Sequence, residues 1–416
     1  MVCLPNTVVQ HTQKLCFDIG LMPSINVIVG PFASLIHQIV IRLIETSTLP
    51  LNSAKASSTD AHVRIRFGNH KAPFFTALKN KVNDYFEQEN ISRNGTSALY
   101  IKASFFIVTY LIAYTILMMA HPAGWIALLI CAYLGAAAAA IGFNIMHDGA
   151  HGSFSTHTWV NVLAAYSINI LGGDAVLWKN KHNIIHHTYT NIEGHDQDIA
   201  QLPVLRLNSM QKRYYLHRFQ HLYCFVVYGL SSLLWVFLLD FIKYFQGKVG
   251  NFKISNMEAK DHLIFWLSKI TYFTLYLVIP IMVWGWTGAI IGFLVFHFVL
   301  GVILSTVFQL AHVVEEAEFT DSHLSHNKIE DEWAVHQVKT TTNFCTKNNW
   351  MTWYVGGLNF QVVHHLFPKI SHVHYPALNN IVVETCREYQ VTYHEFPSFL
   401  SAVRSHMKHL KETANA

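Results

Sequence analysis

The chain has 416 residues, of which 52% are hydrophobic and only 13% are charged. Soluble domains usually carry about 25% charged residues, so this composition favours a membrane protein. The formal net charge of +4 is too small to indicate a nucleic-acid partner, and the six cysteines contain no C-x-x-C pair, which argues against a zinc ribbon or a disulfide framework.

The first part of the chain, residues 1–62, is predicted to be an extension with poorly defined structure. Its apolar stretch over residues 25–44 is interrupted by Gly30 and Pro31, and residues 47–62 have the composition of a linker. No clear cleavage site follows the apolar part, so the segment does not resemble a signal peptide. A presequence that lies on the membrane and an over-extended translation start are both open.

Residues 63–416 contain four apolar runs, each close to the roughly 20 residues that cross a bilayer as a helix. They cover residues 103–120, 125–146, 270–286 and 289–310. Because only short turns separate the first from the second and the third from the fourth, we expect two antiparallel helical hairpins. The two turns contain no Lys or Arg, so the positive-inside tendency places them outside and both chain ends in the cytosol.

Two histidine-rich segments follow the second run. The first places His147 and His151 at i,i+4 spacing, which puts both imidazoles on one face of a helix. The second, KHNIIHHTYTN, repeats this spacing with His182 and His186. His187 lies about 100° further round such a helix, from which it could reach a second metal.

A third segment, NFQVVHHLFPKISH, contains His364 and His365, with Gln361 three and four positions before them. An eighth histidine, His312, lies just past the last apolar run. All eight fall on the predicted cytosolic side, which suits two metal ions with about four nitrogens each. Imidazole suits iron, zinc and copper rather than magnesium or calcium. Structural zinc sites usually contain cysteine, which is missing from these segments, so a dinuclear catalytic site is favoured over structural zinc.

The motifs HxxxH, HxxxHH and QxxHH, in this order and with this pattern of spans, resemble those of the membrane fatty acid desaturases. The match is closest to the front-end branch, in which glutamine replaces the first histidine of the third motif. The surrounding residues are also similar: MHDGAHGSFS, KHNIIHHTYTN followed by GHDQD, and GGLNFQVVHHLFPKISHVHYPAL. The similarity runs from about Val63 to the C-terminus. The three-motif pattern alone is shared with alkane hydroxylases, carotenoid oxygenases and sterol oxidases.

The spans and the resemblance together predict an all-α integral membrane protein. Four transmembrane helices in two hairpins would carry a helical cytosolic cap that holds a dinuclear metal site. The resemblance implies an oxygen-dependent di-iron desaturase, with two iron ions as cofactor and O2 as co-substrate. It would introduce a cis double bond into a fatty acyl chain on the carboxyl side of an existing double bond. Carbons five, six and eight would all fit the sequence.

The resemblance also implies roles for single residues. The iron ligands would be His147, His151, His182, His186, His187, His312, His364 and His365. Gln361 could ligate weakly, act through a water, or line the acyl channel. Asp148, Asp196 and Asp198 could be carboxylates that orient ligand N–H groups. Asp148 is favoured because it lies inside the first motif, whereas solvated loop acids are the alternative for the other two.

The implied partners are a fatty acyl-CoA or acyl-lipid substrate, membrane lipids, and a separate electron donor. This donor would be a cytochrome b5 or a ferredoxin with its reductase, because no fused cytochrome b5 domain is recognisable. A bacterial inner membrane and the endoplasmic reticulum would both suit the spans. Two other functions are open: a related di-iron hydroxylase or ketolase, and a non-catalytic receptor or transporter with zinc-filled histidine clusters.

A fifth apolar run, residues 222–239, lies between the second and third motifs. All the motifs must meet on one side of the membrane, so an even number of crossings separates them. The last two predicted spans already supply two, and residues 222–239 are therefore predicted to be interfacial or re-entrant. Lys269 is expected to snorkel to the interface. His297, in mid-span, is expected to make a packing hydrogen bond inside the bundle.

Overall fold

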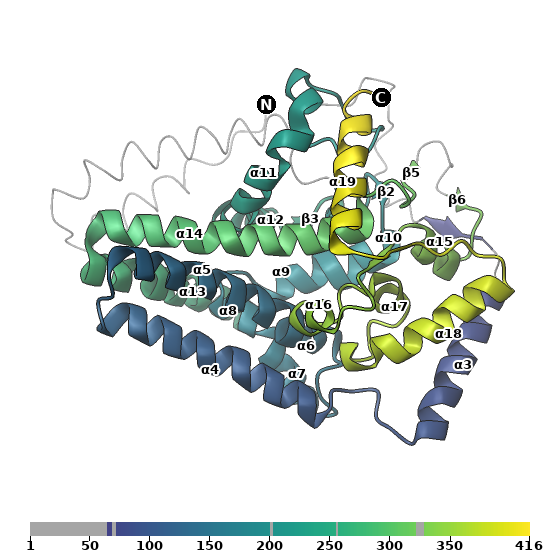
Figure 1. The fold of residues 1–416 in the computed structure, drawn as a ribbon, viewed down its shortest axis with the longest axis horizontal. Coiled ribbons are helices and arrows are strands. Elements are labelled where there is room, and N and C mark those ends of the chain that lie inside the picture. Colours follow the sequence, from purple (N-terminus) through teal and green to yellow (C-terminus); the bar gives the residue numbers. More distant parts are fainter. Residues whose placement is uncertain (1–64, 69–71, 200–202, 255–256, 322–327) are drawn as a thin grey trace. The chain divides into compact units, whose positions relative to one another are not determined.

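The computed structural model describes residues 65–68, 72–199, 203–254, 257–321 and 328–416 (Figure 1). The chain divides into two units, residues 1–61 and residues 62–416. The predicted extension over residues 1–62 lies outside the described residues. All that follows concerns the second unit.

The first helical hairpin consists of α4 (Ser97–Met119) and α5 (Gly124–Ile141). The chain runs on from α5 through the π-helical η1 (Gly142–Met146) into α6 (His147–His151) without leaving the helical path. Alanines dominate the last turns of α5, and their small side chains combine high helix propensity with close packing.

The second hairpin consists of α13 (Ala259–Phe273), η5 (Thr274–Val278) and α14 (Ile279–His312). The helical path reverses inside α14 at Gly285, whose φ of 67° is a left-handed conformation that glycine adopts without steric cost. The rings of Tyr276 and Phe296 lie 5.3 Å apart across the two arms. The predicted spans at 270–286 and 289–310 lie on these arms.

The first arm of this hairpin contains a buried cation, Lys269, that is neutralised by a neighbouring helix. The sequence had suggested that Lys269 snorkels to the interface, but it does not. Its side chain is only 2% exposed and donates to the Asp240 carboxylate at 2.9 Å. It also donates to the carbonyl of Gly172 at 2.6 Å. A paired and hydrogen-bonded ammonium is compatible with a dry helix interface.

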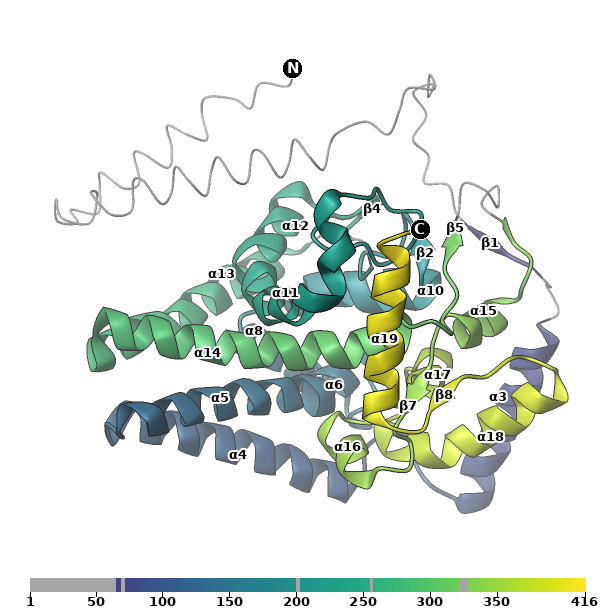
Figure 2. The same cartoon turned by 45° about the horizontal axis from the view of Figure 1, so that its top comes forward.

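The two hairpins pack side by side with their turns at the same end (Figures 1 and 2). The Trp284 indole N–H donates to the Leu117 carbonyl at 3.0 Å, and the same ring lies 5.6 Å from that of His121. At the opposite end, α6 and the end of α14 enter the cap. Four long helices in two hairpins below a helical cap are the predicted fold.

Four helices of the described chain are long and apolar enough to cross a membrane, or five if one bent pair counts as a span. They cover Ser97–Met119, Gly124–His151, Tyr215–Gln246 and Ala259–His312, and the bent pair joins Thr158–Ile170 to Ala175–Tyr189 at 110°. Because Gly285 divides the last of the four, the two hairpins alone account for four spanning arms. Tyr215–Gln246 contains the apolar run 222–239.

This additional segment consists of η3 (Tyr215–Phe219), α11 (Gln220–Leu234), η4 (Trp235–Leu239) and α12 (Asp240–Gln246). In Figure 1, α11 rises steeply from α14 instead of running along it. His297 is fully buried, and its Nδ1 lies 2.9 Å from Ser232 Oγ of α11. Its Nε2 lies 2.6 Å from the hydroxyl of Tyr272 on α13. This is the packing role expected for His297.

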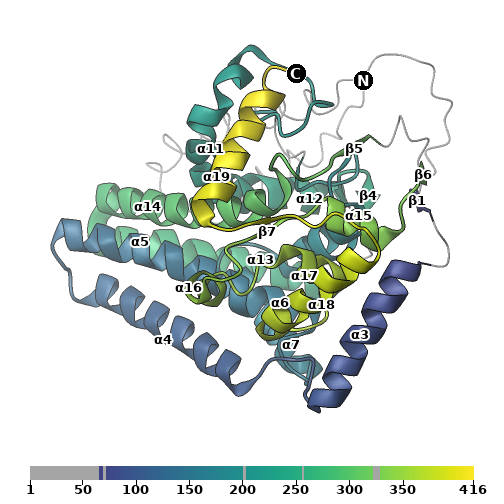
Figure 3. The same ribbon diagram turned by 45° about the vertical axis from the view of Figure 1, so that its right-hand side comes forward.

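Short helices and paired strands build the cap (Figure 3). The helices before α13 are α3 (Pro73–Glu89), α7 (Thr158–Ala165), α8 (Ser167–Ile170), α9 (Ala175–Lys179), η2 (Asn180–His186) and α10 (His187–Tyr189). Those after α14 are α15 (Trp333–Lys339), α16 (Asn349–Tyr354), α17 (Gln361–Leu366), η6 (His372–His374), α18 (Tyr375–Glu388) and α19 (Phe399–Thr413). α18 packs along α3, and buried side chains of both helices join those of α17 in one hydrophobic cluster.

Two-residue strands tie distant parts of the cap together. Parallel pairs join β1 (Arg66–Phe67) to β6 (Lys328–Ile329), β2 (Ile192–Glu193) to β5 (Thr320–Asp321), and β7 (Asn343–Phe344) to β8 (Glu395–Phe396). β3 (Lys248–Val249) and β4 (Phe252–Lys253) form an antiparallel pair. The β2–β5 pair links the chain just after the second histidine motif to the chain just after α14.

Candidate metal centre

All eight predicted histidines converge where the cap meets the two hairpins. They come from α6, from η2 and the start of α10, from the end of α14, and from α17. None is more than 8% exposed. Seven of them form two groups in which the candidate ligand atoms lie within 4.8 Å of one another. The first histidine group is His147, His151, His182 and His364, and the second histidine group is His186, His312 and His365.

The winding of η2 decides how the second motif divides between the groups. In a π-helix the hydrogen bonds run from i to i+5, so His187 rather than His186 comes to lie over His182. The Nε2 atoms of His182 and His187 are 3.3 Å apart. His186 is thereby turned towards α14, where its ring lies 4.8 Å from that of His312. The ring of His187 lies between the two groups, 4.6 Å from that of His364 and 4.5 Å from that of His365, so its reach to a second metal stays a prediction.

The nitrogens that face inward lack partners, which is the signature of a site built for a metal. Five buried Nε2 atoms have no hydrogen-bond partner among the described residues, namely those of His151, His186, His312, His364 and His365. The Nε2 of His182 lies 3.3 Å from those of both His147 and His187. Two nitrogens bound to one metal at about 2.1 Å would be separated by about 3 Å. Unpaired buried polar atoms cost stability, so these residues fit a pair of metal ions.

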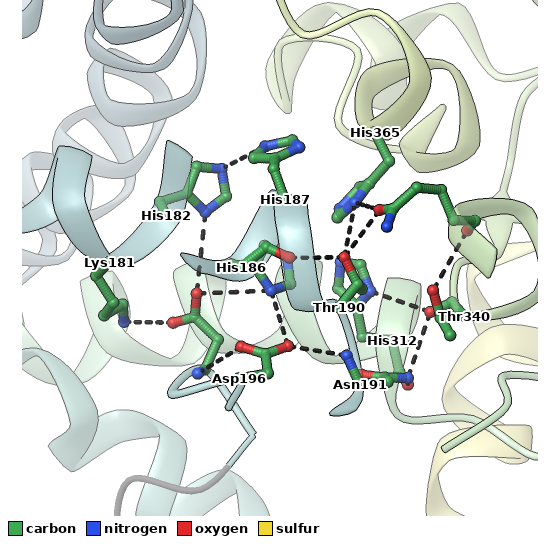
Figure 4. Close-up of polar contacts among 12 residues, drawn as sticks. Lys181, His182, His186, His187, Thr190, Asn191, Asp196, His312, Thr340 and His365 are labelled. Atoms are coloured by element: carbon green, nitrogen blue, oxygen red, sulfur yellow. Dashed lines mark hydrogen bonds and ion pairs between the residues drawn. The ribbon is translucent and has the colours of Figure 1, made fainter. Parts of the chain in front are cut away.

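The outward nitrogens of the second histidine group are held by the cap (Figure 4). The Nδ1 of His186 lies 2.9 Å from an Asp196 carboxylate oxygen, and the Nδ1 of His365 lies 2.8 Å from Gln337 Oε1. The Nδ1 of His312 faces the Thr340 carbonyl at 3.3 Å. These are acceptors, so each imidazole donates from Nδ1 and leaves its Nε2 lone pair free for a metal.

The first histidine group has fewer outward partners. The Nδ1 of His364 lies 3.1 Å from the Tyr375 hydroxyl, and that of His182 lies 3.9 Å from Asp198, which also pairs with Lys181. Burial alone would raise the pKa of Asp198. The Lys181 ammonium and the neighbouring imidazoles outweigh burial and hold this pKa well below its usual range, so the carboxylate is charged.

Both histidines of α17 are suited to metal binding in their protonation state. Burial, reinforced by the neighbouring imidazoles, holds the pKa values of His364 and His365 well below the usual range. Neutral imidazole is the ligand form, so the site is ready to bind a cation without first losing protons at neutral pH.

An apolar cavity of about 230 Å³ leads to the first histidine group. Its inner part is lined by side chains of α5, η4 and α14, among them Ala138, Val236 and Leu300. Its other end reaches His147, His182 and Gln361. The Gln361 side chain is 4% exposed, and its Oε1 has no hydrogen-bond partner among the described residues. A long apolar chain in this cavity would pass directly beside the first group.

Comparison with known proteins decides what such a site belongs to. Residues 123–397 match the family model for fatty acid desaturases. This chain belongs to the fatty acid desaturase family. It is 38% identical to an sn-1 linoleoyl-lipid 6-desaturase of Arthrospira platensis, over 85% of this chain and 96% of that protein. It is 32% identical to an enzyme of the same name from Synechocystis sp., over 85% and 98% of the two chains. An acyl-lipid (8-3)-desaturase of Physcomitrium patens is 33% identical over 82% of this chain and 71% of its own.

These comparisons confirm the predicted family and enzyme class. The relatives are named as linoleoyl-lipid 6-desaturases and as an acyl-lipid (8-3)-desaturase, and they match most of the chain. A fatty acid desaturase with four apolar spanning arms is an integral membrane protein that acts on lipid.

Of the three carboxylates predicted to orient ligand N–H groups, Asp148 has a different role from the one expected. Asp196, fully buried, and Asp198 lie beside ligand-type histidines, as described above. Asp148 was the favoured candidate, yet its carboxylate accepts from Ser371 at 2.7 Å and from His372 Nδ1 at 3.0 Å. Because Asp148 follows His147 directly, its side chain points away from the site and anchors the chain after α17.

Sequence reasoning missed several side chains that brace the desaturase site. Gln337, Thr190 and Tyr375 are all buried and bond to ligand-type histidines. Asn191 contributes differently: its amide donates to the His312 carbonyl at 2.8 Å, and its φ is 54°. Asn tolerates this left-handed conformation better than most residues, and its position in TYTN directly after the second motif was the one available signal.

Proposed function

We propose that this desaturase is a front-end enzyme whose eight histidines hold two iron ions. It would insert a cis double bond on the carboxyl side of an existing one in an acyl chain. The observation that carries the proposal is the set of unpartnered Nε2 atoms in two groups, of which the first borders an apolar cavity. The relatives that are named as 6-desaturases and (8-3)-desaturases support the front-end regiochemistry.

Bound at these groups, iron would supply the coupled reduction of O2 to water and removal of two hydrogens from adjacent methylene carbons. The chain's own residues prepare the site for this chemistry. Asp196, Gln337 and the Thr340 carbonyl fix the tautomer of the second group by accepting from Nδ1. His147 and His182 border the cavity, so the first group faces the acyl chain. Position rather than acid–base strength then selects the carbons.

Gln361 is proposed to line the acyl channel. It borders the cavity together with His147 and His182, and its unpartnered oxygen lies where the cavity meets the first histidine group. The alternatives are a weak ligand and a ligand that acts through a water. Replacing it with histidine would distinguish these roles, because an added ligand would alter iron affinity whereas a channel residue would alter the position of the new double bond.

The apolar run 222–239 is proposed to remain on the cytosolic side as an interfacial or re-entrant segment. Both ends of the segment that contains it touch the cap. At its start, the Gln220 amide donates to the Leu410 carbonyl of α19 at 2.7 Å. After its end, Val249 packs in one cluster with Ile185, which lies inside the second histidine motif, and with Ile192, which follows it. The positive-inside tendency then puts this cap and both chain ends in the cytosol.

The substrate carrier and the electron donor complete the proposal. Acyl-CoA and acyl-lipid are both compatible with an apolar cavity that reaches His147 and His182. Because the reaction consumes two electrons that the chain does not carry, a separate cytochrome b5 or ferredoxin with its reductase is proposed to deliver them. A bacterial inner membrane or the endoplasmic reticulum would provide such donors.

The test is product analysis. The chain is expressed in a host that lacks polyunsaturated fats but has an electron donor, and linoleic acid is supplied. Mass spectrometry locates any new double bond, with His364→Ala as the control. A new bond on the carboxyl side that disappears in the control supports the proposal. A hydroxylated product would instead favour the related hydroxylase, and purified protein with zinc but no iron and no oxygen consumption would favour a non-catalytic protein.

A further inference from the structure

A second apolar cavity lies deeper between the two hairpins. It has a volume of about 240 Å³ and sits near the hairpin turns. Its lining comes from α4, α5 and both arms of the second hairpin, and includes Leu117, Leu128, Cys131, Leu134 and Trp284. The described site does not use this space.

The two cavities border the same pair of helices at consecutive turns. On α5, Leu134 lines the deep cavity and Ala138 lines the cavity beside the histidines. On α14, the corresponding residues are Phe296 and Leu300. Four residues of helix are about 6 Å, so only a thin layer of side chains separates the two spaces. At this level the helices touch, because a Cβ on Gly135 would lie 2.5 Å from the Phe296 carbonyl oxygen.

Three aromatic rings make up this layer, and we call them the aromatic wall: Tyr272, Tyr276 and Phe296. The rings of Tyr272 and Tyr276 stack at 4.5 Å, and Tyr276 lies 5.3 Å from Phe296. On the side of the histidines, Tyr272 lies close to Val236. Both side chains border Gly172, where an added Cβ would lie 2.8 Å from the Tyr272 ring and 3.0 Å from Val236 Cγ1. Tyr276 and Phe296 line the deep cavity, and Val236 lines the cavity beside the histidines, so the wall lies between the two spaces.

Hydrogen bonds on both sides keep the wall in place. The hydroxyls of Tyr276 and Tyr110 are 2.5 Å apart, which ties the wall to the first hairpin. The Tyr272 hydroxyl donates to His297 Nε2 at 2.6 Å, and Ser232 in turn bonds to His297. Phe296 alone has no such bond. It is the part of the wall that can be removed without leaving a buried polar group unpaired.

We propose that the aromatic wall sets the longest acyl tail, counted from the reacting carbons to the methyl end, that the enzyme accepts. Phe296 is the specificity-determining residue. Behind it lies preformed space that a longer tail would fill if the wall were opened. The inference rests on the proposed function, since it takes the first cavity to hold the acyl chain.

The experiment compares acyl chains with the same double bonds counted from the carboxyl end but with tails that differ in steps of two methylenes. Phe296→Ala should raise conversion of the longer chain relative to the shorter one by roughly tenfold. Leu128→Ala is the matched control, because it enlarges the deep cavity from its far side and leaves the wall closed. Phe296→Ala combined with Ala127→Leu should restore the wild-type preference by filling the deep cavity again.

A second readout does not depend on turnover. Purified protein is heated with each acyl chain, and the tail that gives the largest rise in Tm is identified. This tail should become longer in Phe296→Ala and in the milder Phe296→Leu, which guards against a variant that does not fold. An unchanged tail preference in a folded variant would overturn the inference, as would an equal shift in Leu128→Ala. A wild type that binds acyl chains but makes no unsaturated product would refute the proposed function while the binding profile still tests the wall.

Discussion

The two histidine groups differ in what surrounds them. Members of the first histidine group border the apolar cavity, and in the hydrogen bonds described only His364 has an outward partner closer than 3.5 Å. All three members of the second group are bonded at Nδ1 to the cap, through a carboxylate, an amide and a carbonyl. The centre must contact an apolar substrate and also keep its geometry. The first histidine group borders the space proposed for the acyl chain, and the second is held in place by polar groups of the cap.

The largest expected effect comes from removing one histidine of either group. His364→Ala and His312→Ala should both abolish desaturation, because each deletes a nitrogen that has no other purpose among its described contacts. The measurement is product formation together with iron per folded protein. If the two groups hold separate ions, each variant should lose roughly half of the iron. Activity that survives in His312→Ala would show that the second group is not part of the reaction.

Asp196 provides the next test, since it distinguishes bracing from mere proximity. Asp196→Asn weakens the acceptor of the His186 N–H and should lower iron affinity by about 10- to 100-fold. Asp148→Asn is the matched control. It is an equally buried carboxylate next to a ligand-type histidine in sequence, but it holds Ser371 and His372. This control should lower the Tm and leave iron affinity unchanged. Equal losses of affinity in both variants would contradict the proposed difference.

These two aspartates also show how far the sequence could be interpreted. Spacing predicted all eight histidines, because i,i+4 pairs and their positions after apolar runs are local properties. The direction of an aspartate side chain is not local. Asp148 was favoured for its place inside a motif, whereas the partner of His186 lies ten residues later in a loop that returns to the site. Only the fold brings that loop back.

Helix geometry limited the prediction in a similar way. The placement of His186 in the second histidine group depends on π-helical hydrogen bonds in η2, and the sequence pattern assumes 3.6 residues per turn. Lys269 could snorkel to the interface by its place at the start of the third predicted span, yet it is buried. Its partner Asp240 lies on another helix and makes the buried position possible. Apolar runs predicted the hairpins well, but they could not reveal this long-range pair.

Gln337 offers a smaller test of how the second group is braced. Its Oε1 accepts from His365 Nδ1 at 2.8 Å and from the Thr190 hydroxyl at 2.9 Å, so this one oxygen positions both side chains. Gln337→Leu leaves both donors without this acceptor and should lower activity by roughly tenfold, since an unpaired buried donor costs about 1–3 kcal/mol. Gln337→Glu retains an acceptor at the same reach and should recover most of the loss. Assays at saturating iron would separate this effect from simple metal depletion.

Tyr375 should show the smallest effect, because it belongs to the less braced group. Its hydroxyl lies 3.1 Å from His364 Nδ1, and Tyr375→Phe removes that acceptor while the ring keeps its place beneath α17. One neutral hydrogen bond contributes about 1 kcal/mol, so activity should fall by roughly fivefold. The regiochemistry of the product gives a sharper measure. If the first group faces the substrate, a loosened His364 should broaden the position of the new double bond, whereas Gln337→Leu should slow the reaction without moving it. A shift in position caused by Gln337→Leu alone would reverse the roles assigned to the two groups.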